Sequence, residues 1–166
     1  MQLSHHSKPF NQKTFPIILV CNNVSNAPNV GSLFRTAEAF GVEKILFCGN
    51  EIPKGRKMTK TSRSTEKMVE FQENAEIIEC IEQLKLEGYK TYAIEITTNS
   101  KALKNFIFPK DLPIAFVIGS ENFGVDEDVL SMVDEVIHLE MYGKNSSMNL
   151  VQATSITLYE LTKQLS

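Results

Sequence analysis

Short apolar runs alternate along the chain with segments whose apolar residues recur every three or four positions. The run of Ile, Leu and Val at 15–21 is typical of a buried strand, whereas the apolar spacing within 75–87 is typical of a helix. On this basis the sequence predicts strands at 15–21, 44–48, 68–71, 89–96, 113–118 and 135–139. The predicted helices span 30–40, 75–87, 126–133 and 147–165.

This alternation predicts an α/β fold with a mostly parallel sheet flanked by helices. The chain has 166 residues, of which 42% are hydrophobic, and this is enough for one core. We expect a single domain over 15–166, preceded by a polar N-terminal tail at 1–14. Residues 99–112 are expected to form an irregular connection.

The residue types that hold metals and disulfides are sparse. Cys21, Cys48 and Cys80 are odd in number and far apart, so we expect reduced core thiols and a cytoplasmic protein. The three histidines show no metal-ligand spacing, and no metal site is expected: His5, His6 and His138. Without a long apolar stretch or a charged leader, neither membrane insertion nor secretion is expected.

A basic segment stands out against the formal net charge of −3. Between Lys54 and Lys67 there are six basic residues and one acidic residue, Glu66, interleaved with Thr and Ser. Such a segment can neutralise phosphates while its hydroxyls add contacts; the alternative interpretation is a solvated loop. The candidate RNA-binding residues are Lys54, Arg56, Lys57, Lys60 and Arg63.

Parallel sheets bind ligands outside the carboxyl ends of their strands, so the segments that follow strands are the best candidates for a site. After the first strand, Asn29, Gly31 and Arg35 come together where a loop becomes a helix. The N-terminal part of a helix suits a residue that handles an anion. The alternative is an Asn cap followed by an Arg on a solvated face.

Two further segments follow apolar strands. In 118–125, Gly119 and Gly124 allow the backbone to turn tightly and to approach a ligand, with Glu121 fixed in the turn. A turn that carries a surface carboxylate is the alternative. In 139–149, Ser147 is expected to cap the last helix, whereas packing gives no comparable reason for an Asn at position 149.

Several common active sites are missing from the sequence. It has no dinucleotide fingerprint, phosphate loop or nucleophile elbow, and His138 lies inside a strand pattern, which argues against a catalytic triad. The three segments instead offer amide, hydroxyl, carboxylate and guanidinium groups. Such a pocket is suited to orienting two substrates and stabilising a developing charge.

In order and spacing, these segments resemble the SpoU family of RNA ribose 2′-O-methyltransferases, within the SPOUT superfamily. The resemblance runs from about Phe15 to the C-terminus and rests on three motifs: Asn29-Val30-Gly31 with Arg35-Thr36-Ala37, Gly119-Ser120-Glu121 with Gly124, and Ser147-Met148-Asn149. It implies a C-terminal deep trefoil knot and a homodimer whose active site lies near the partner subunit. Knots are otherwise very rare.

The resemblance also implies S-adenosyl-L-methionine as cofactor and RNA, either tRNA or rRNA, as substrate. The implied cofactor-binding residues are Ile94, Gly119, Leu139, Ser147 and Met148. The implied catalytic residues are Arg35, Asn29, Glu121, Ser147 and Asn149. Because a guanidinium stays protonated, we expect Arg35 to hold an RNA phosphate and stabilise the incipient 2′-alkoxide, while the others orient Arg35 and the ribose and Ser147 fixes its loop.

The sequence departs from the family pattern at two positions: Glu140 stands where Pro is usual, and Met148 where Leu is common. Glu140 could alter cofactor affinity or the approach of RNA. We expect no added RNA-binding domain, which leaves residues 1–14 and 54–67 as candidate RNA contacts. Two alternatives stay open: a noncatalytic RNA-binding or assembly protein on the same fold, and a methyltransferase directed at a base.

Overall fold

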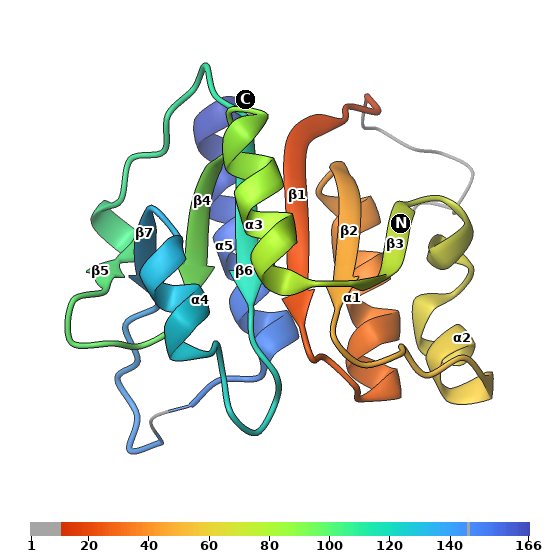
Figure 1. Cartoon of the computed structure of the whole chain (residues 1–166). Helices are drawn as coiled ribbons and strands as arrows, with labels where there is room; N and C mark the ends of the chain where they lie inside the picture. Colours follow the sequence, from red (N-terminus) through yellow and green to blue (C-terminus); the bar gives the residue numbers. More distant parts are fainter. Residues whose placement is uncertain (1–10, 146) are drawn as a thin grey trace.

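A computed structural model describes residues 11–145 and 147–166. Its seven strands form one sheet in the order β3-β2-β1-β6-β4-β7-β5, and all neighbouring strands run parallel (Figure 1). The strands are β1 (Phe15–Asn22), β2 (Val42–Cys48), β3 (Glu70–Ala75), β4 (Lys90–Ile94), β5 (Lys101–Ala102), β6 (Ile114–Ile118) and β7 (Glu135–His138). The predicted parallel α/β fold is confirmed.

Helices cover both faces of the sheet. They are α1 (Ala27–Ala39), α2 (Arg56–Ser62), α3 (Ile77–Leu86), α4 (Glu127–Met132) and α5 (Leu150–Leu165), with short 3-10 helices η1 (Thr65–Lys67) and η2 (Leu103–Asn105). In Figure 1, α3 and α4 lie in front of the sheet, and α1 and α5 lie behind it. The central strands are apolar without interruption because both of their faces are buried.

Strand β1 shows how one strand serves two cores. Ile17 and Leu19 belong to the apolar cluster that includes Leu158 of α5, whereas Ile18 belongs to the cluster that includes Ile81 of α3. All of these side chains are at most 6% exposed. Alternation along a strand therefore fills the core on each face.

The largest difference from the sequence prediction is in the basic segment. Residues expected as a loop form α2 and η1, and α2 packs on α1. Gly31 makes this contact possible, because a Cβ at that position would lie 2.5 Å from the carbonyl oxygen of Met58. The expected irregular connection at 99–112 likewise contains β5 and η2.

The cysteines behave as core thiols. Cys21 and Cys48 are buried and Cys80 is partly buried, all without disulfides. Burial raises the pKa of the Cys21 thiol, so it is a poor nucleophile. Among residues 11–145 and 147–166, no side chains form a metal-binding cluster and no helix could cross a membrane. His5 and His6, like most of the predicted tail, lie outside the described residues.

Candidate active site

The carboxyl ends of β1, β4, β6 and β7 meet at one edge of the sheet, the lower edge in Figure 1. A cavity of about 1460 Å³ opens there. Its walls come from the segments after β4, β6 and β7 and from the start of α5: 94–98, 118–125, 138–145 and 147–150. The site therefore lies where parallel sheets usually bind ligands.

Asn29 is not the cap of α1, as one interpretation of the sequence had it. Asn26 caps the helix, because its side-chain oxygen accepts the N–H of Asn29 at 3.2 Å. The Asn29 side chain is thereby available to the site, and its Nδ2 donates to Oε1 of Glu121 at 3.0 Å. The backbone N–H of Asn26 donates to the same carboxylate oxygen at 3.1 Å.

Asn149 caps the last helix, so the prediction that Ser147 does so is wrong. Helix α5 begins at Leu150, and Oδ1 of Asn149 accepts the N–H of Val151 at 2.9 Å. Asn149 also donates from Nδ2 to Oδ1 of Asn29 at 3.2 Å. The Ser147 hydroxyl instead donates to Oδ1 of Asn145 at 3.3 Å, within its own loop.

The loop between β6 and α4 is closed tightly on itself. Ser120 and Gly124 exchange two backbone hydrogen bonds of 3.0 Å. A Cβ on Gly119 would overlap the carbonyl carbon of Gly124, so Gly119 is required for this closure. Gly124 has a φ of +68°, which favours glycine. The glycines therefore hold Glu121 in place.

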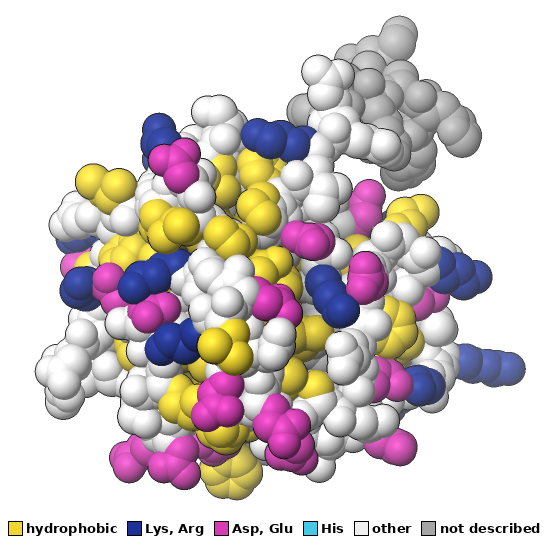
Figure 2. Space-filling view, turned by 45° about the horizontal axis from the view of Figure 1, so that its top comes forward, with side chains coloured by type: hydrophobic (Ala, Val, Ile, Leu, Met, Phe, Trp, Pro, Cys, Tyr) yellow, Lys and Arg dark blue, Asp and Glu magenta, His cyan; other side chains and the backbone are white. Residues whose placement is uncertain are grey.

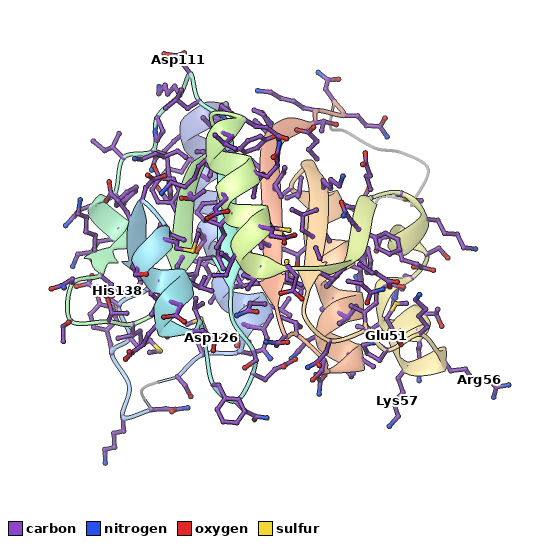
Figure 3. All side chains as sticks on the ribbon, viewed as in Figure 1. Glu51, Arg56, Lys57, Asp111, Asp126 and His138 are labelled. Atoms are coloured by element: carbon purple, nitrogen blue, oxygen red, sulfur yellow. The ribbon has the colours of Figure 1, made fainter. Side chains whose placement is uncertain are left out.

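Glu95, which the sequence analysis missed, docks this loop on the end of β4. Its carboxylate accepts the N–H of Val125 at 3.1 Å and that of Ile96 at 2.9 Å. A second hydrogen bond runs from Nδ2 of Asn22, the last residue of β1, to Oδ2 of Asp126 at 2.8 Å. Figure 3 labels Asp126 at this edge. A polar side chain directly at the end of an apolar strand is the signal that could have identified Glu95 and Asn22.

All the residues that the resemblance implies for cofactor binding line the cavity: Ile94, Gly119, Leu139, Ser147 and Met148. Of the implied catalytic residues, the hydrogen bonds join Asn29, Glu121 and Asn149. Arg35 is exposed on α1, and no residue in 11–145 or 147–166 makes a hydrogen bond or ion pair with its side chain. Its catalytic role stays a prediction.

The predicted RNA-binding residues differ in their surroundings. Lys54 pairs with Glu73 at 2.7 Å, and this hydrogen-bonded pair raises the pKa of Lys54. Arg56 and Lys57 project from α2 away from the body of the protein (Figure 3). Lys60 and Arg63 are also exposed. These four exposed cations are better placed for phosphate contacts than Lys54.

The cavity itself is acidic. Four carboxylates line it, against one lysine: Glu95, Glu121, Glu127 and Glu140, with Lys144. Acidic side chains also gather along the lower edge of the face in Figure 2. A cavity of this charge favours a cationic ligand over an anionic one.

Fold and site together define a parallel α/β protein with a ligand cavity built by loops remote in sequence. The model of the SpoU rRNA Methylase family matches residues 16–159, and the chain belongs to this family.

Relatives by sequence include a tRNA (guanosine(18)-2′-O)-methyltransferase of Aquifex aeolicus, 26% identical over 148 residues that cover 89% of this chain and 69% of that protein. An enzyme of the same name from Thermus thermophilus is 27% identical over 150 residues, 89% of this chain and 75% of that protein.

Among solved structures, the Aquifex aeolicus TrmH/SpoU tRNA modifying enzyme matches with a TM-score of 0.82 and 25% identity, over 92% of this chain and 77% of that one. An AdoMet-bound rRNA methyltransferase from Sinorhizobium meliloti has a TM-score of 0.84 over 95% of this chain and 59% of that one. At 19% identity, this second match shows the fold alone.

Proposed function

We propose that this chain, an RNA ribose 2′-O-methyltransferase by its family and relatives, takes its methyl group from S-adenosylmethionine and acts on tRNA. The observation that carries the proposal is the Asn29–Glu121–Asn149 network, which joins three remote segments beside the cavity. Noncatalytic binding would not require such a network, and the relatives named above modify ribose rather than a base.

The cavity suits this cofactor in size and charge. Ligand pockets usually measure about 300–1000 Å³, and the cavity of about 1460 Å³ leaves room for a nucleotide as well. Ile94, Leu139 and Met148 offer apolar surface for an adenine, and the acidic lining suits a sulfonium cation. When bound, the cofactor supplies an electrophilic methyl group.

The chain's own residues would orient the ribose. Asn29 uses its side-chain donor on Glu121 and its acceptor on Asn149, which fixes the amide. Glu121 accepts both of its hydrogen bonds at Oε1, and no described residue donates to Oε2. Oε2 is therefore available to accept a hydrogen bond from the ribose hydroxyl. The Arg35 guanidinium would hold the adjacent phosphate and stabilise negative charge that develops on the hydroxyl oxygen.

The proposal includes a homodimer. Helix α5 and the residues before it expose apolar side chains, with Met148 37%, Ile156 43% and Tyr159 62% exposed. A second copy that covers this surface would bury them. Arg35 meets no described partner within one chain, which supports a site completed by the second copy. Light scattering that gives twice the chain mass of 18.7 kDa would support the dimer.

The proposal also includes the family's deep trefoil knot, made by the segment that leaves β7 and leads into α5. In Figure 1 this segment runs along the lower edge, beside the β6–α4 loop. The hydrogen bond from Asn149 to Asn29 supports a C-terminal segment drawn in toward α1.

Alkaline hydrolysis of labelled RNA tests the proposed reaction. Purified protein is incubated with methyl-labelled cofactor and with total tRNA or rRNA from cells that lack the protein. A 2′-O-methyl group blocks cleavage of the next phosphodiester, so we expect label in alkali-resistant dinucleotides from tRNA. Label in mononucleotides would indicate a base-directed enzyme, and no label in either RNA would favour the noncatalytic alternative.

A further inference from the structure

Two aromatic side chains stand almost fully in solvent at the cavity. Phe123 is 88% exposed and Tyr142 is 89% exposed, more than any other large apolar side chain that the structure describes. Both line the cavity, and they come from different loops, after β6 and after β7. An exposed aromatic ring beside a substrate cavity is a ready surface for a planar ligand.

The backbone that carries Phe123 is well fixed. The residue lies inside the turn closed by Ser120 and Gly124, and its own N–H donates to Oγ of Ser120 at 3.2 Å. Glu121 of the hydrogen-bonded network lies two residues earlier in the same turn. The backbone of Phe123 therefore has a set position relative to Glu121, and little backbone freedom is lost when a ligand stacks on the ring.

Tyr142 is oriented by Glu140, the residue at which the chain departs from the family's usual Pro. The Tyr142 hydroxyl donates to Oε2 of Glu140 at 3.4 Å, and the same oxygen lies 2.5 Å from Nζ of Lys104. This pairing with Lys104 lowers the pKa of the Glu140 carboxyl, which therefore stays ionised at neutral pH. Glu140 thus links the Tyr142 loop to η2.

The charges around the rings decide which part of an RNA can lie against them. Glu95, Glu121, Glu127 and Glu140 line the same cavity and repel phosphates. An uncharged base plane meets no such repulsion. We propose that Phe123 and Tyr142 are stacking platforms for unpaired bases beside the methylated ribose, while phosphates lie along α2. This inference rests on the proposed function and predicts a substrate with unpaired nucleotides at the target.

Alanine variants test the platforms. Stacking contributes roughly 5- to 150-fold in affinity per base, so Phe123→Ala and Tyr142→Ala should each raise the KM for tRNA within that range. The dissociation constant for cofactor should stay unchanged. Phe123→Tyr keeps the ring and should retain the KM of the wild type. Tyr142→Phe keeps the ring but loses the hydrogen bond to Glu140, so its KM should lie between those of the wild type and Tyr142→Ala. Leu86→Ala is the matched control, since Leu86 is 83% exposed and ends α3 at the opposite edge of the sheet.

Fluorescence measures stacking without turnover. The chain contains no Trp, so Phe123→Trp introduces a single reporter. With cofactor already saturating, addition of total tRNA should quench this reporter, and a fully base-paired RNA duplex should quench it less. Leu86→Trp should show no quenching with either RNA.

Three results would overturn the platforms. The alanine variants could have the same KM as Leu86→Ala. They could weaken cofactor binding, which would place the rings on the cofactor. They could also change the molecular mass of the protein in solution, which would place the rings in a subunit interface. Each leaves the proposed function standing as long as the wild type labels tRNA. Failure of the proposed function would show instead as wild-type protein that labels no RNA.

Discussion

Asn149 donates a hydrogen bond from Nδ2 to Oδ1 of Asn29, 3.2 Å away and 120 residues earlier in the chain. The other end of the same amide caps α5 by accepting the N–H of Val151. One side chain therefore fixes the start of the last helix and one side of the candidate active site. Asn149 therefore contributes to both stability and activity, and substitutions can separate the two contributions.

Asn149→Asp should keep the cap of α5 and lose turnover. A carboxylate still accepts the Val151 N–H, but it cannot donate to Asn29 and it lies near Glu121, which repels it. Asn149→Ala should lose turnover and also about 1 kcal/mol of unfolding free energy through the missing cap. Urea unfolding and methyl transfer to tRNA measure the two effects. An active Asn149→Asp variant would show that the hydrogen bond from Asn149 to Asn29 is not needed for catalysis.

Arg35→Ala should abolish turnover while it changes cofactor affinity by less than about twofold, because Arg35 does not line the cavity proposed for the cofactor. Arg35→Lys should restore little, since an ammonium cannot make the bidentate contact of a guanidinium. Glu38→Ala, an exposed change on the same helix, is the control. Normal turnover in Arg35→Ala would refute the proposed role.

Gly31→Ala should destabilise the protein although alanine is the better helix former. Helix propensity favours alanine by up to about 1 kcal/mol. The new Cβ would meet the Met58 carbonyl oxygen at 2.5 Å, and crowding of this kind costs about 1–3 kcal/mol. Gly143→Ala, outside every helix and strand, meets nothing within 4 Å and should be neutral. Chemical unfolding compares the two; equal stabilities would mean that α2 moves aside freely.

The sequence predicted the sheet well because its strong signals are local. Apolar runs such as the one in β6 indicated buried strands, and Gly41 and Gly88 marked helix ends. Helix α2 was missed because its polar residues give no apolar periodicity; only Met58 and Ser62 are buried in it. Its position depends on the close approach to Gly31, a tertiary contact that no local pattern shows.

The site residues were easier to name than to place. Residue type and order indicated Asn29, Glu121 and Asn149, but not which Asn caps a helix. Asn26 and Asn29 both suit a cap, and only the hydrogen bonds show that Asn26 takes this role. The place of Glu95 at the end of an apolar strand is a local signal, but its partner Val125 is 30 residues away, so the sequence does not show which loop it holds.

Stability should fall in acid through Asp134. Burial opposes ionisation of this carboxyl, but hydrogen bonds from the N–H and hydroxyl of Thr91, with Lys85 and Lys90 nearby, lower its pKa overall. A lowered pKa in the folded state stabilises the fold above the unfolded value of about 3.9, and this contribution disappears as pH falls through the folded pKa.

Asp134→Asn isolates this effect. At pH 7 the variant should be less stable than wild type by about 1.5–3 kcal/mol, the usual contribution of a hydrogen bond to a charged group. The difference should shrink as the pH falls below about 4, as measured by urea unfolding across the range. A difference that stays constant with pH would show that the charge of Asp134 contributes nothing.

The most direct test of the central claim is mass spectrometry of nucleosides from total tRNA and rRNA of cells without this protein, compared with the parent. We predict the loss of one 2′-O-methylated nucleoside from tRNA, restored by the wild-type chain but not by Arg35→Ala. Unchanged ribose methylation in both RNA pools would contradict the account.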